Sequence, residues 1–158
     1  MSKSDTISEL LELVAQYNRH MYIYGKNYRQ YGTEHRLRQD QIHLIDLIGR
    51  HPCCNLTYLA EVGETEIPTM SLQIERLRKM GLVNKKRSEN SQRELEVTLT
   101  EAGMQAFQFH WELDENWSKS TTQLLQSYTE EQLLAIRHFL SDLLCTIQRQ
   151  QDAPVANP

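Results

Sequence analysis

The basic residues in the middle of the chain are the side chains best suited to bind a ligand, and the ligand they fit is phosphate. All seven Lys and Arg residues of segment 51–99 lie between Arg76 and Arg93, and only Glu89 opposes them within that stretch. The chain as a whole has a formal net charge of −4. A local basic patch concentrates positive potential whatever the total charge, so the sequence predicts a phosphate-binding surface here.

Other reactive side chains form no recognisable catalytic or metal-binding motif. No Ser or Cys lies in a nucleophile elbow and no Gly-rich phosphate cradle occurs, so we do not expect an enzyme or a cofactor. His20, His43 and His110 could in principle bind zinc, but they lack the spacing of zinc ligands. The adjacent Cys53 and Cys54 would close a disulfide only with strain, so we expect ordinary thiols.

Helical periodicity predicts the elements that position the basic patch. Helices are expected over about 6–31 and 38–49, each with an apolar stripe at spacings of three and four residues. A short helix at 55–63 should begin at an N-cap residue and end at a glycine. The next helix, about 65–80, accommodates Pro68 in its first turn.

The pattern then changes from helical to alternating. Residues 82–86 and 94–99 are predicted to form two strands joined by the polar turn 88–91, which makes a β-hairpin. A helix should follow at 100–126, and a last one should start at the capping box of Thr129.

The predicted elements follow in the order helix, short helix, turn, longer helix and hairpin. This is the order of a winged helix-turn-helix. The longer helix can enter a DNA major groove about 12 Å wide, and a basic hairpin, the wing, can reach the neighbouring backbone. The predicted fold class is mainly α with a small β-hairpin wing, flanked by long N- and C-terminal dimerisation helices.

Thr69 and Ser71 could meet base edges or phosphates, or bond only within their own helix. The residues predicted to contact DNA are Pro68, Thr69, Ser71, Gln73, Arg76, Lys85, Lys86, Arg87 and Arg93.

Several short segments resemble the MarR family of bacterial regulators. Pro68-Thr-Met-Ser71 is similar to the start of the family's recognition helix, Gly81-Leu-Val83 to its entry into the wing, and Leu99-Thr-Glu-Ala-Gly103 to the junction after the wing. With the flanking long helices, the resemblance covers nearly the whole chain.

The resemblance implies a homodimer that binds double-stranded DNA and represses nearby genes until a small molecule or an oxidant releases it. The dimer would be built from residues 5–32 and 100–150, and the DNA-binding lobe would span 38–99. We expect 1–158 to form a single domain with a flexible tail at 151–158. Such a dimer should prefer pseudo-palindromic DNA with half-sites about one helical turn apart.

The sequence also departs from the family pattern. Ser91 stands where the family often has an Asp that steadies the wing-tip Arg, and Leu72 stands where it often has an Arg in the recognition helix. Glu64 and Glu66 lie near the start of that helix, where they would repel phosphate. These features support a rival interpretation, in which the winged helix is a protein-interaction or dimerisation module that has lost specific DNA binding.

An effector pocket is expected under the lobe, where the family places its ligands. Aromatic, histidine and methionine side chains there could bind a small aromatic or phenolic effector, or could simply form core. The candidates are Tyr17, His20, Met21, Tyr24, His43 and Trp111.

The composition sets the broad class of the protein. A chain of 158 residues can bury a core without a disulfide framework. No apolar run reaches the roughly 18 residues of a membrane span, and no hydrophobic signal segment opens the chain. We therefore expect a cytoplasmic protein with no membrane partner.

Overall fold

The computed structural model describes residues 2–87 and 95–152. The predicted turn at 88–91, with Ser91, and the predicted wing-tip residue Arg93 lie outside these residues.

The chain divides into two compact units, Met1–Leu113 and Asp114–Pro158. The boundary falls inside one continuous helix, so the two halves of that helix belong to different units. This continuity is why no linker signal marks the boundary in the sequence.

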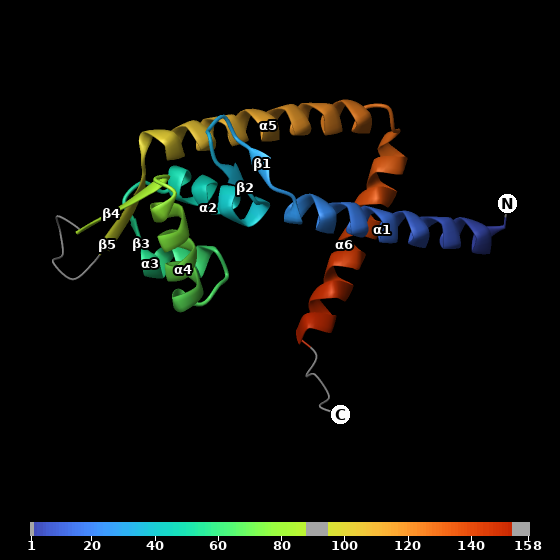
Figure 1. The fold of residues 1–158 in the computed structure, drawn as a ribbon. Helices are drawn as coiled ribbons and strands as arrows, with labels where there is room; N and C mark the ends of the chain where they lie inside the picture. The colour runs from blue at the N-terminus through green and yellow to red at the C-terminus, as the bar shows by residue number, and fades with distance from the viewer. Residues whose placement is uncertain (1, 88–94, 153–158) are drawn as a thin grey trace. The chain divides into compact units, whose positions relative to one another are not determined.

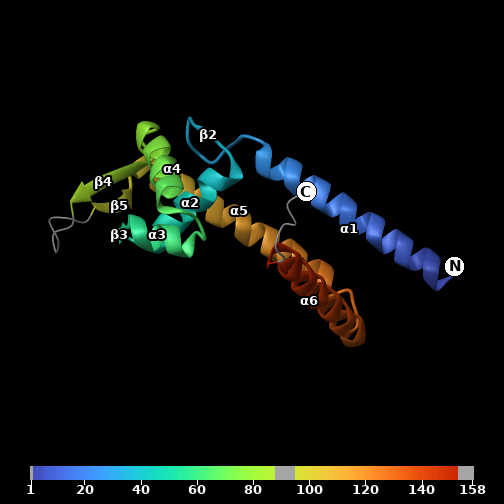
Figure 2. The ribbon, with the colours of Figure 1, turned by 90° about the horizontal axis from the view of Figure 1, so that it is seen from below.

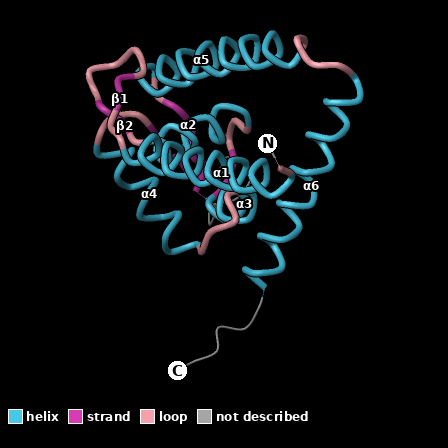
Figure 3. Tube along the Cα trace, turned by 90° about the vertical axis from the view of Figure 1, so that its right-hand side faces the viewer, coloured by secondary structure: helices cyan, strands magenta, loops and turns pink. Residues whose placement is uncertain are grey.

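Helices dominate the first unit, and its strands are short (Figures 1 and 3). Its elements in chain order are α1 (Lys3–Lys26), β1 (Arg29–Gln30), β2 (Arg36–Leu37), α2 (Gln39–Arg50), β3 (Cys54–Asn55), α3 (Leu56–Val62), α4 (Ile67–Lys79), β4 (Val83–Arg87), β5 (Leu95–Leu99) and the first half of α5 (Glu101–Leu125).

The second unit contains the rest of α5 and the helix α6 (Glu130–Asp152). The predicted capping box at the start of α6 is confirmed, because the Thr129 amide donates to Gln132 Oε1 at 2.9 Å and the Gln132 amide donates to Thr129 Oγ1 at 3.3 Å. The helix extends to Asp152, two residues into the segment predicted as a flexible tail, and 153–158 lie outside the described residues.

The winged helix-turn-helix predicted from the order of elements is confirmed. Helices α2, α3 and α4 lie together beside a three-stranded antiparallel sheet of order β3-β5-β4 (Figure 2). The apolar side chains assigned to the inner faces of these helices form the core of the lobe. The buried residues among them are Ile42, Ile45, Ile48, Leu59, Ala60, Met70, Ile74 and Leu77.

Short-range sequence signals set the ends of α3 and α4 as expected. Asn55 caps α3, and its Oδ1 accepts a hydrogen bond from the Tyr58 amide at 2.8 Å. Pro68 lies in the first turn of α4. Gly81, with φ +71°, follows the last turn in the left-handed conformation that glycine adopts without strain.

The first helix is shorter than predicted. It ends at Lys26 rather than near Tyr31, because the chain turns back at a small hairpin of β1 and β2. Gly32, directly after the predicted end of the helix, has φ +68° and lies in the loop between these strands. Tyr31 is 2% exposed and packs edge-on against His110, with 5.8 Å between the ring centroids. Burial of this ring outweighs the helical pattern of the residues before it.

The sheet contains one strand that the sequence analysis missed. Cys54 and Asn55 pair with Val97 and Glu96 of β5, and two residues are too short to show alternation. Leu95, Val97 and Leu99 alternate along β5; Val97 is buried, but Leu95 is 48% exposed because it lies at the end of β5 away from the core. No helix of the described residues is long and apolar enough to cross a membrane.

The wing and α5 meet the end of α4 at one tight junction. Thr100 caps α5, because its Oγ1 accepts from the Gly103 amide at 3.0 Å. The same hydroxyl donates to the Gly81 carbonyl at 2.6 Å, and the Thr100 amide donates to the Leu82 carbonyl at 3.0 Å. A Cβ on Gly103 would lie 2.0 Å from the Leu82 carbonyl oxygen, so only glycine allows this approach.

Replacing Gly103 should therefore destabilise the protein strongly. We expect Gly103→Ala to lower the free energy of unfolding by at least about 2 kcal/mol, because the backbone must shift to admit the methyl group. Urea unfolding followed by circular dichroism measures the loss. The control Gln105→Ala, at an exposed position of α5, should change stability by less than about 0.5 kcal/mol. Equal stability of the two variants would show that the junction is not tightly packed.

Candidate nucleic-acid interface

The outer face of α4 carries most of the residues predicted to contact DNA. Pro68 and Thr69 are exposed in the first turn, Ser71 and Gln73 are half-buried, and Arg76 is exposed about two turns further along. The N-cap residue, Glu66, makes no side-chain cap. Pro68 has no N–H group, so the first turn of α4 can offer an anion the amides of Ile67 and Thr69.

One apolar side chain interrupts this face. Leu72 is 54% exposed and lies between the polar positions of α4. Its side chain can contact a thymine methyl group but cannot bind phosphate. The family departure noted at this position therefore removes a cation from the centre of the face.

The basic patch is smaller than the sequence count suggested, because Glu75 neutralises part of it. Arg78 Nε and Nη2 lie 2.9 and 2.7 Å from the two Glu75 carboxylate oxygens, and Lys85 Nζ of β4 lies 3.8 Å from Glu75 Oε2. Glu75 stands one residue before the basic stretch, so a count that starts at Arg76 overlooks it. The hydrogen bond from Arg78 is the main reason why the pKa of Glu75 lies below its ordinary value.

Three cations of the patch have no carboxylate partner among residues 2–87 and 95–152, namely Arg76, Lys86 and Arg87. Lys79 makes no ion-pair contact with Glu75 but still helps to lower the pKa of that carboxyl. Lys86 and Arg87 are exposed on β4, while the side chain of Lys85 is only 22% exposed. Alternation along the strand thus separates Lys85, which faces Glu75, from Lys86, which faces the other way.

The residues proposed for an effector pocket lie in different surroundings. Tyr17, Met21 and Tyr24 are exposed on α1, and Tyr24 carries the guanidinium of Arg29 over its ring at 3.3 Å from the centroid. His20 Nδ1 lies 2.8 Å from the Gln16 carbonyl.

The other two candidates lie on α2 and α5. His43 packs against the buried His110, with 5.5 Å between ring centroids, and Trp111 is 53% exposed. In the part of the chain that the structure describes, no three His, Cys, Asp or Glu side chains are grouped so that they could hold a metal ion.

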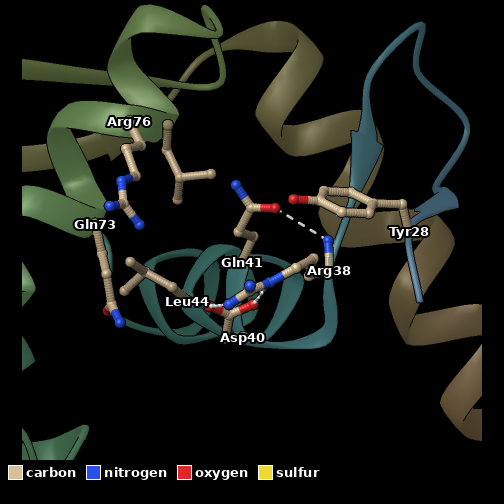
Figure 4. Close-up of a pocket in the computed structure, with 8 residues that line it drawn as sticks. Tyr28, Arg38, Asp40, Gln41, Leu44, Gln73 and Arg76 are labelled. Atoms are coloured by element: carbon tan, nitrogen blue, oxygen red, sulfur yellow. Dashed lines mark hydrogen bonds and ion pairs between the residues drawn. The ribbon is translucent and has the colours of Figure 1, made fainter. Parts of the chain in front are cut away.

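The structure places a different pocket beside α4, and Figure 4 shows its lining. Sequence reasoning missed it because its residues come from three separate segments. None of them has a motif, although Arg38 and Arg76 are both cations. The residues that line it are Tyr28, Arg38, Asp40, Gln41, Leu44, Gln73, Arg76 and Leu77.

The order of elements, the exposed α4 and the basic hairpin define a winged helix-turn-helix protein. The model of the MarR family matches residues 37–95, which confirms the resemblance found in the sequence.

Comparisons with known proteins agree on this fold. The HTH-type transcriptional regulator PchR of Bacillus subtilis (strain 168) is 26% identical over 110 residues, which cover 70% of this chain and 65% of PchR, less than two-thirds of its length. The crystal structure of Lactococcus lactis ZitR, a zinc-responsive MarR family member, matches with a TM-score of 0.70 at 18% identity, over 92% of this chain and 99% of ZitR. Streptococcus pneumoniae FabT in complex with DNA matches with a TM-score of 0.68 at 19% identity, over 94% and 99% of the two chains.

The two ion pairs of Glu75 predict how far its pKa is lowered and which partner lowers it more. In the native protein the Glu75 carboxyl should titrate below its ordinary value of 4.5. Because folding lowers the pKa of Glu75, its ion pairs stabilise the folded protein at pH values above the unfolded-state pKa. This stabilisation is lost as the pH falls through the folded-state pKa. NMR titration of the Glu75 side-chain carbon measures it. Arg78→Gln should raise the pKa more than Lys85→Gln, and the reverse order would contradict the observed pairing.

Proposed function

We propose that this protein is a transcriptional regulator that binds DNA as a homodimer and represses its target genes until a small-molecule effector releases it. The observation that carries the proposal is the exposed face of α4, where Thr69, Gln73 and the unpaired Arg76 follow an N-terminus with no side-chain cap. In this proposal α4 enters the major groove. FabT, one of the proteins with this fold, has been solved in complex with DNA.

The wing supplies the second contact. Lys86 and Arg87 are exposed on β4, and in the proposal they reach the backbone beside the major groove. Arg93, which lies outside the described residues, remains our candidate for the minor-groove contact at the wing tip.

The two flanking helices support the homodimer. No residue of α1 is buried in the single chain, and both α1 and α6 expose large apolar side chains. Apolar surface of this extent indicates a protein interface. The exposed apolar residues of the two helices are Ile7, Leu10, Leu11, Leu13, Tyr17, Met21, Tyr22, Ile23, Tyr24, Leu134, Phe139, Leu140, Leu144 and Ile147.

A second candidate function is a protein-interaction module without specific DNA binding. The exposed Leu72 at the centre of α4 favours it, as does Glu75, which offsets one of the two positive charges of Arg78 and Lys85. Both candidates use the same fold, so only DNA binding separates them.

The distribution of unpaired cations makes DNA binding testable by salt dependence. Each phosphate contact on duplex DNA adds about 0.9 to the slope of log K against log salt. Arg76→Ala should therefore lower the slope by about 0.9 for each subunit bound, whereas Arg78→Ala, which removes a cation already paired with Glu75, should lower it much less. Fluorescence anisotropy at several salt concentrations measures both. Equal slopes for wild type and Arg76→Ala would contradict the assigned contact.

The dimer has its own test. We expect sedimentation velocity to give a dimer for the wild type at micromolar concentration and a monomer for Leu144→Asp, because a carboxylate would be buried in the apolar interface of α6. Arg149→Asp, on the opposite side of the same helix, should stay dimeric. A monomeric wild type would contradict the proposed assembly.

A further inference from the structure

Leu72 is the apolar side chain that faces outward at the middle of α4. Met70, Ile74 and Leu77 are the buried residues of this helix, and they define its core-facing side. At about 3.6 residues per turn, Leu72 is just over half a turn from both Met70 and Ile74, so it stands on the side opposite the core. Its side chain is 54% exposed. Single exposed leucines are common on protein surfaces, and what distinguishes Leu72 is this position.

The polar residues on the two sides of Leu72 face other parts of the lobe. On one side Gln73 and Arg76 line the pocket beside α4, which α2 helps to form (Figure 4). On the other side Glu75 faces β4, where Lys85 Nζ lies 3.8 Å from Glu75 Oε2. The middle of the outer face, between these two sides, is therefore occupied by Leu72.

The residues one turn before Leu72 add carbon rather than charge to the outer face. Pro68 and Thr69 are exposed in the first turn of α4, four and three residues before Leu72. Pro68 has no N–H group, and Thr69 carries a methyl group beside its hydroxyl. The nearest cations of the outer face, Arg76 and Lys79, come one and two turns after Leu72. The leading half of this face therefore presents no charge to a ligand.

A leucine in the middle of a helix that enters the major groove restricts which base pair can lie opposite it. The base edges in this groove present hydrogen-bond donors and acceptors, and the thymine C5 methyl is the one alkyl group among them. Leucine makes no hydrogen bond, so a G·C pair that it covers would lose water from its polar edge without a replacement. A thymine methyl against the leucine instead removes apolar surface of both partners from water.

We infer that Leu72 is a specificity-determining residue that contacts a thymine methyl group in each half-site of the DNA. The inference rests on the proposed function, in which α4 enters the major groove. Because the contact involves no charge, it adds sequence preference and leaves the salt dependence of binding unchanged. Arg76 has the complementary role in the proposed function, since a phosphate contact adds affinity and salt dependence without sequence preference.

The experiment removes the methyl group from the DNA and the leucine from the protein. The full chain selects a duplex from a random library, and each thymine of that duplex is then replaced in turn by deoxyuridine, which lacks only the methyl group. Fluorescence anisotropy measures the affinity. We expect one thymine in each half-site at which deoxyuridine weakens wild-type binding about fourfold, and about fifteenfold when both half-sites are changed.

Three variants assign this effect to one side chain. Leu72→Ala should bind the thymine and deoxyuridine duplexes equally well, with the same salt slope as the wild type. Leu72→Met keeps an apolar side chain of similar size and should retain the discrimination. The matched control is Arg76→Ala, which should lose affinity and salt slope but should still discriminate thymine from deoxyuridine.

Three results would overturn the inference, and they differ in what they leave standing. If the wild type binds the selected duplex but no thymine methyl affects its affinity, or the half-sites contain no thymine, Leu72 has no such role and the proposed function stands. If deoxyuridine weakens the wild type and Leu72→Ala alike, another residue contacts the methyl group. If no duplex is enriched and none binds selectively, the proposed function fails, and the inference fails with it.

Discussion

The close approach of α5 to the carbonyl of Leu82 is the constraint on which the shape of the lobe depends. Four elements meet there, at the end of α4, the start of β4, the end of β5 and the start of α5. Thr100 donates to the carbonyls of Gly81 and Leu82, and Gly103 leaves no space between the helix and the strand. Net hydrogen-bond contributions of about 0.5–1.5 kcal/mol each are modest. Their effect is large here because they fix the direction in which the wing leaves α4.

A fixed wing is what gives the basic patch its charge distribution. Lys85 reaches Glu75 only because β4 starts directly after α4 and runs back beside it. The same strand turns Lys86 to the other face, away from Glu75, so that Lys86 and Arg76 keep no carboxylate partner among residues 2–87 and 95–152 and can bind phosphate. Backbone geometry therefore decides which of the seven basic residues of this segment are available, and composition alone does not. The unpaired Arg76 also lines the pocket, which links the two surfaces through one side chain.

Most of the lobe could be predicted from the sequence because its signals are local. Apolar spacing identified α2, α3 and α4, and the caps at Asn55 and Thr100 act within three residues of their own positions. The wrong predictions concern segments whose structure is set by contacts between residues far apart in the sequence. Tyr31 leaves the helical pattern because it packs against His110, and β3 exists because Cys54 pairs with Val97. The pocket could not be found for the same reason, since Tyr28, Gln41 and Gln73 are brought together only by the fold.

The central claim is that the exposed face of α4 and the wing bind DNA selectively, and a competition titration tests it most directly. A labelled duplex from the region upstream of the protein's own gene is bound by the wild type at physiological salt and displaced by either the same unlabelled duplex or a scrambled one. If binding is selective, the scrambled duplex should compete at least about 1,000-fold less well, the lower end of the range for sequence-specific regulators. Equal competition by the two duplexes would contradict the claim for that region and would favour the protein-interaction module.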